Sequence, residues 1–178
     1  MARELFAKDI EEKVSLFHRA FDRPADLLTA VLRGHMMVEE RLHDVISAGV
    51  ASYVRPYDEN DIFSFGTAAK LAQAIVGSAA DSDLWKAIKS LNALRNAIGH
   101  RYEPKRLDSL LAKFFKDTEP TTSSVFKNRD IAYLHEGESE ETHAIVVRVR
   151  CMALWSVLGI HADSLAKDLD DALMSRRQ

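Results

Sequence analysis

Three polar residues, Arg95, Asn96 and His100, have the types and the spacing needed to handle a phosphodiester. The planar guanidinium of arginine forms paired hydrogen bonds with phosphate oxygens and keeps its charge throughout a reaction. Histidine titrates near neutral pH, so it can remove a proton from a ribose 2′-hydroxyl or return one to a leaving oxygen. Asparagine can orient either partner without adding charge. The set lacks the carboxylate cluster that a two-metal nuclease needs, so we expect any cleavage to be metal-independent, leaving a 2′,3′-cyclic phosphate and a 5′-hydroxyl.

The helix that must position these residues places Arg95 inside its apolar stripe. Large residues recur at spacings of three and four on the same face as Arg95, and they are Leu84, Ile88, Leu91, Ile98 and Tyr102. A guanidinium there needs a carboxylate, a phosphate or a water-filled cleft. Glu39, on an earlier helix, is the carboxylate we consider first, with Arg33 and Arg41 as competing partners for it.

The end of this helix decides whether His100 can act together with Arg95. Gly99 is expected to end the helix, which would turn His100 back toward Arg95. Asn96 and His100 are four residues apart and so lie on one line of the helix. The ordinary alternative is that Arg95 and His100 interact only with the helix dipole and form a surface pair.

The segment Leu94-Arg95-Asn96-Ala97-Ile98-Gly99-His100 resembles the Arg-x4-6-His motif of the HEPN superfamily, with a polar residue directly after the arginine as in its ribonuclease members. The order of segments 34–42, 65–72 and 91–96 is similar to the mannitol operon repressor-like branch, and the resemblance covers roughly 25–103. It implies that Arg95 and His100 are the catalytic or RNA-contacting pair and that Asn96 is an accessory polar residue. It also implies a homodimer that brings two motifs to one cleft.

The charge distribution points to an anionic ligand for the same region. The chain carries a net charge of −3, but the window 84–116 holds eight basic residues and two acidic ones, a net charge of +6 that leaves −9 elsewhere. We expect Arg101, Lys105 and Arg106 to contact RNA. Tyr102 is a supporting candidate because its ring could stack on a base, although core packing is its commoner use. For the remaining lysines of the window, a solvated helix surface is an equally good interpretation.

Metal and cofactor sites are not expected. His35, Glu39 and His43 follow at intervals of four, but eight helical residues separate the two histidines by about 12 Å, too far for one tetrahedral ion. The single cysteine, Cys151, lies in an apolar helix and is expected to be inert. The chain has no glycine-rich phosphate loop.

Hydrophobic periodicity predicts a single all-α domain, 1–178, of six or seven helices in a bundle like that of HEPN proteins, with the HEPN-like core over about 25–117. The expected helices cover 4–21, 25–49, 64–76, a segment capped by Asp81 or Ser82, 104–117 and 140–173. Residues 51–61 read as a loop. Residues 118–139 show no strong period and read as disordered or as a mobile flap. Residues 145–150 have strand-like composition, but their surroundings favour one long helix.

The charged start of the chain contains no apolar core of a secretory signal, and the apolar stretch around Cys151 to Ile160 looks too short to span a bilayer. A cytoplasmic protein without membrane contact is therefore expected.

Together these observations predict an RNA-binding protein or a metal-independent endoribonuclease of a bacterial toxin-antitoxin, stress or phage-defence type. The alternative is a non-catalytic transcriptional regulator or interaction module like the mannitol repressor branch. A cognate antitoxin or a nucleotidyltransferase are the partners that the resemblance implies besides RNA and a second copy.

Overall fold

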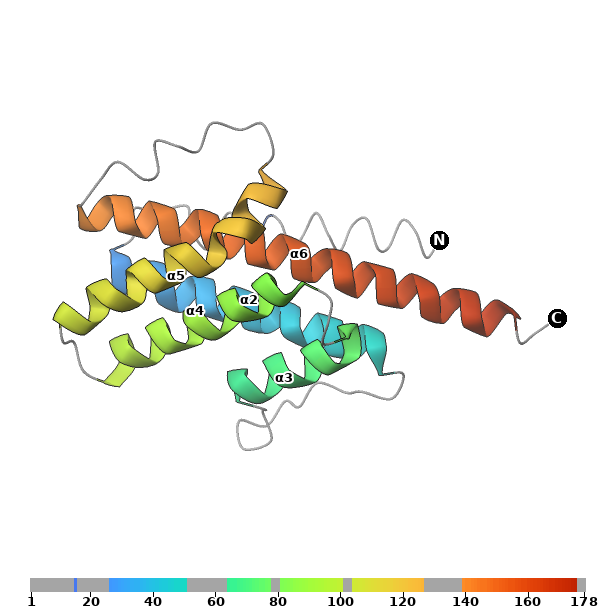
Figure 1. Cartoon of the computed structure of the whole chain (residues 1–178). Helices are drawn as coiled ribbons and strands as arrows, with labels where there is room; N and C mark the ends of the chain where they lie inside the picture. The colour runs from blue at the N-terminus through green and yellow to red at the C-terminus, as the bar shows by residue number, and fades with distance from the viewer. Residues whose placement is uncertain are drawn as a thin grey trace.

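The computed structural model describes residues 26–50, 64–77, 81–100, 104–126 and 139–175, together with residue 15; within these ranges the side chains of residues 100, 104, 105 and 173 are excepted. The described residues form five α-helices and no strand, which confirms the all-α prediction (Figure 1). The helices are α2 (Leu27–Gly49), α3 (Phe65–Val76), α4 (Ser82–His100), α5 (Pro104–Val125) and α6 (Glu140–Ser175). The helix expected over 4–21 and the loop expected over 51–61 lie outside the described residues.

Helices α2 and α6 pack along each other, α4 packs on α5, and α3 packs on α2 and α4. One apolar core joins these contacts, because each helix turns a stripe of apolar side chains inward. The largest completely buried side chains come from every helix except α3, and they include Leu42, Ile46, Ile88, Leu91, Phe114 and Leu154.

Capping residues set the limits of α2 and α3. Asp26 caps α2 by accepting a hydrogen bond from the Thr29 amide at 2.7 Å. Ser64 caps α3 in the same way, accepting from the Thr67 amide at 3.3 Å. Gly77 follows α3 with a φ of 104°, a backbone conformation that favours glycine. The limits predicted for these two helices are therefore confirmed to within two residues.

Helix α5 is longer than the sequence predicted. It runs to Val125, through Pro120 and a run of threonines and serines, so the prediction of a loop over 118–139 was wrong for 118–125. The hydroxyl of Thr118 donates to the Phe114 carbonyl at 2.7 Å, and that of Thr122 donates to the Thr118 carbonyl at 2.8 Å. Both side chains are buried, so tertiary packing outweighs weak helix propensity here. Residues 127–138 of the predicted loop are outside the described part.

Helix α6 includes the strand-like segment 145–150 without interruption. By length and composition alone, its stretch Glu140–Ala172 is the one described helix that could cross a membrane, so the expectation of too short an apolar stretch was wrong. Half of its most apolar window is buried in the fold, where Val147, Cys151 and Leu158 belong to the core. A core helix of a soluble protein passes the same test.

Candidate functional site

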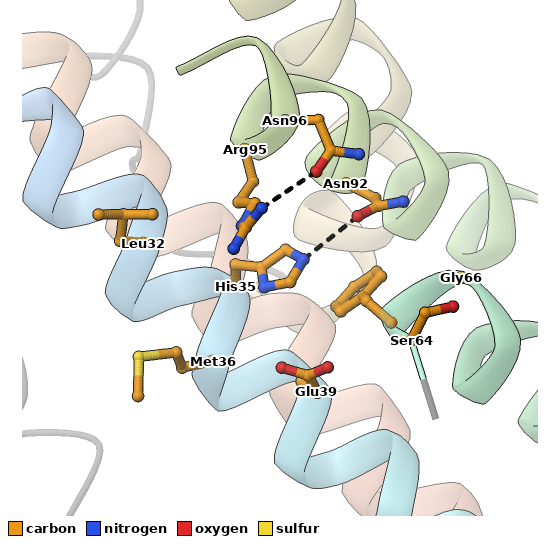
Figure 2. A pocket seen from close by; sticks show the side chains of 10 residues that line it. Leu32, His35, Met36, Glu39, Ser64, Gly66, Asn92, Arg95 and Asn96 are labelled. Atoms are coloured by element: carbon orange, nitrogen blue, oxygen red, sulfur yellow. Dashed lines mark hydrogen bonds between the residues drawn. The ribbon is translucent and has the colours of Figure 1, made fainter. Parts of the chain in front are cut away.

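A cavity of 560 Å³ opens between α2, α3 and the C-terminal half of α4, and it contains three of the residues expected to form a site (Figure 2). Arg95 and Asn96 enter it from α4, and Glu39 enters it from α2. The other lining residues are Leu32, His35, Met36, Ser64, Phe65, Gly66 and Asn92. The lining combines apolar side chains, Leu32, Met36 and Phe65, with a few polar groups, as is usual for a small-molecule site.

The Arg95 guanidinium is partly buried and is compensated only by a neutral group among the described residues. Its Nη1 donates a hydrogen bond to Asn96 Oδ1 at 3.3 Å. In the described part of the chain, no carboxylate forms an ion pair with it. Glu39 lines the same cavity, but Arg95 forms its hydrogen bond with Asn96. The structure therefore gives Arg95 an amide partner in place of the expected carboxylate of Glu39. Arg41, one of the competing partners, pairs with Asp44 at 2.9 Å.

His35 lines the cavity from α2, beside Arg95 (Figure 2). Its Nε2–H donates to Asn92 Oδ1 at 3.3 Å, and its ring stacks on Phe65 with a centroid separation of 3.9 Å. Burial lowers the pKa of His35 from 6.5 to about 4; the Asn92 hydrogen bond opposes this shift, and the nearby charge of Arg95 adds to it. The imidazole is therefore neutral at pH 7 and contributes no positive charge to the cavity.

The first turn of α3 forms the third side of the cavity. Ser64, Phe65 and Gly66 line it, so the positive end of the dipole of this helix faces the same space as Arg95. A Cβ atom on Gly66 would lie 3.9 Å from Asn92 Nδ2, which places that amide directly beneath the turn. Amide and guanidinium donors thus converge with a helix N-terminus, an arrangement that suits an anion.

The backbone corrects one expectation about His100. Helix α4 continues through Gly99 to His100, so Gly99 does not end the helix. Five residues of continuous helix rotate the chain by about 140° relative to Arg95. Positions 95 and 100 therefore lie on different sides of the α4 backbone. Gly99 lies beside the guanidinium: a Cβ there would lie 3.7 Å from Arg95 Nη1, an ordinary van der Waals contact.

The remaining expected RNA contacts fall mostly outside what the structure describes. Arg101 and Tyr102 are outside the described residues, and the side chains of His100 and Lys105 are not described. Arg106 is exposed on α5. Two lysines of the basic window are paired with carboxylates just outside it: Lys86 with Asp83 at 2.8 Å and Lys113 with Asp117 at 2.7 Å.

Comparison of the chain with protein-family models, with curated proteins and with solved structures finds no match.

The sequence pattern missed the contributions of His35, Asn92 and Phe65 to the cavity. The sequence suggested His35 as a poor metal ligand or as a residue at the edge of the core stripe, and it is buried. Among the described residues no group of three His, Cys, Asp or Glu is placed to hold an ion. Asn92 stands three residues before Arg95 and so shares its face of α4, which is the one signal that pointed to it. Phe65 is contributed by another helix, and no pattern along the chain links it to His35.

Proposed function

We propose that this chain is an RNA-binding protein of the HEPN type and that the cavity beside Arg95 holds a phosphate of the RNA backbone. The observation that carries the proposal is the Arg95 guanidinium in an open cavity, hydrogen-bonded to a neutral amide at 3.3 Å. A permanent cation in such a place attracts an anion, and phosphate matches the planar donor geometry of arginine.

The rest of the cavity supports the same ligand class. The dipole of α3 and the amides of Asn92 and Asn96 add partial positive charge, and Glu39, the one carboxylate among the lining residues, does not form an ion pair with Arg95 in the described structure. A volume of 560 Å³ falls within the usual range for small-molecule sites and is large enough for a nucleotide rather than a bare ion. With the ring of His35 neutral, Arg95 is the one positively charged side chain among the residues that line the cavity, and Glu39 is the one negatively charged side chain.

Cleavage is the catalytic form of this proposal. Arg95 would stabilise the charge on the phosphorane, and His100 would remove the proton of the 2′-hydroxyl, without a metal ion. Because α4 is helical through His100, positions 95 and 100 lie on different sides of the helix backbone within one chain. A homodimer that brings the His100 of a second copy to the Arg95 cavity is the arrangement that would combine them.

The continuity of α4 favours the second candidate, a regulator or interaction module that binds RNA without cleaving it. In that case Arg95 and Asn96 hold the strand and His100 has no part in chemistry. The two candidates share the cavity and differ only in the role of His100.

One set of purified proteins tests both candidates: wild type, Arg95→Ala, His100→Ala and, as a control, Lys113→Ala. Lys113 is an exposed lysine of the same basic window, and it does not line the cavity. Fluorescence anisotropy with a single-stranded RNA should show about 10-fold weaker binding for Arg95→Ala, the loss of a charged hydrogen bond, and a change of about 2-fold at most for Lys113→Ala. The proposal is refuted if wild type does not bind RNA, or if Arg95→Ala binds RNA with the affinity of wild type. Incubation in EDTA then separates the candidates: cleavage that His100→Ala abolishes identifies the ribonuclease, and intact RNA identifies the binding module.

A further inference from the structure

His35 differs from the three nitrogen-bearing side chains that α4 brings to the cavity shared with Arg95, and like Glu39 it comes from α2 and can accept a hydrogen bond. Arg95, Asn92 and Asn96 bring N–H donors from α4, whereas His35 enters from α2 and is nearly buried. Its Nε2–H is used by Asn92 Oδ1 at 3.3 Å. Figure 2 shows the other ring nitrogen, Nδ1, on the side of the ring turned away from Asn92, and the described residues offer no hydrogen-bond partner to it.

The protonation state of His35 follows from its surroundings. A neutral imidazole carries one N–H, so with the proton on Nε2 the Nδ1 atom holds a lone pair and can only accept. A second proton is disfavoured because the ring is buried and Arg95 is close by. The stack on Phe65 holds the ring in this orientation.

This lone pair excludes one kind of ligand group and requires another. Phosphate oxygens also carry lone pairs, so they are repelled at Nδ1 and attracted at Arg95. The group that fits Nδ1 is a hydrogen-bond donor within one sugar unit of the phosphate, since His35 and Arg95 line the same 560 Å³ cavity. A ribose 2′-hydroxyl meets both conditions, and deoxyribose lacks it.

We propose that His35, held in place by Asn92, selects ribose over deoxyribose by accepting a hydrogen bond from the 2′-hydroxyl of the nucleotide whose phosphate lies at Arg95. The inference rests on the proposed function and adds the recognition of the sugar to it. A bound strand without the hydroxyl shields His35 Nδ1 from water and offers it no hydrogen-bond donor. Binding of deoxyribose therefore costs the desolvation of this acceptor in addition to the missing hydrogen bond.

The test measures the affinities of full-length protein for three single strands of one sequence: RNA, DNA and 2′-fluoro RNA. The fluoro strand has no donor at the 2′ position, so it separates the hydrogen bond from the shape of the sugar. We expect wild type to prefer RNA about 10-fold over both other strands, the value of one hydrogen bond to a buried acceptor. His35→Phe, which keeps an aromatic ring on Phe65, should bring the three affinities together by weakening RNA binding alone. His43→Phe changes another buried histidine of α2 outside the cavity and should keep the wild-type ratios.

The outcomes distinguish this inference from the proposed function. If wild type binds all three strands with equal affinity and Arg95→Ala weakens that binding, the role of His35 is overturned and the phosphate site stands. A His35→Phe protein that keeps the preference for RNA would overturn that role as well. Absence of binding to any strand would overturn both. The comparison of strands uses wild-type protein only, so it remains decisive even if His35→Phe does not fold.

Discussion

Acid should destabilise this fold through His35. The pKa of His35 is about 4 in the folded protein and 6.5 in its ordinary state. Because the folded value is the lower one, the unfolded chain takes up the proton first as the pH falls. The contribution of the neutral ring is therefore complete above pH 6.5 and is lost as the pH falls toward 4. Between pH 7.5 and pH 5 these two values correspond to a loss of about 2 kcal/mol, or about 1 kcal/mol with allowance for solvent at the open side of the cavity.

Urea denaturation followed by circular dichroism at pH 7.5 and pH 5.0 measures this loss. His35→Phe removes the titrating group and keeps the ring stack, so its free energy of unfolding should fall by about 1 to 2 kcal/mol less than that of wild type over the same interval. Equal falls in the two proteins would refute the reasoning. A direct measurement is the NMR titration of the His35 ring protons, and a midpoint near 6.5 would show that neither burial nor Arg95 perturbs the ring.

Two further predictions concern helix α5. Pro120→Ala should raise the free energy of unfolding by about 1 to 3 kcal/mol, because an exposed proline inside a helix removes one backbone hydrogen bond. The gain should appear as a higher urea midpoint. An unchanged midpoint would mean that α5 does not continue through this residue. Glu119→Gln should lower the free energy of unfolding by about 2 kcal/mol, because it leaves the buried charge of Arg150 without its ion-pair partner. Arg150 is 3 % exposed and pairs with Glu119 Oε2 at 2.7 Å, and its Nη1 already has no hydrogen-bond partner among the described residues. Arg150→Met, which removes the buried charge itself, should cost less, and the reverse order in thermal melts would contradict this account.

Local patterns along the chain were sufficient for the helices with clear caps and clear periodicity. Asp26 before α2 and Ser64 before α3 are short-range signals, since the capping side chain and the amide it accepts from are three residues apart. The prediction failed at 118–125 for the same reason. Pro120 and the residues beside it oppose a helix locally, and only the burial of Thr118 and Thr122 against the rest of the bundle overcomes that preference.

The sequence by itself determined that Arg95 lies within an apolar stripe and needs an anionic partner or a cleft, because a charged group at helical spacing among leucines and isoleucines is visible without coordinates. The tertiary structure alone decided which of these it has: an open cavity, a hydrogen bond to Asn96, and a neutral His35 stacked on Phe65 from a third helix. It also decided that α4 continues through Gly99 to His100. These features depend on how α2, α3 and α4 pack together, and contacts between residues 57 positions apart, as His35 and Asn92 are, leave no periodic trace in the chain.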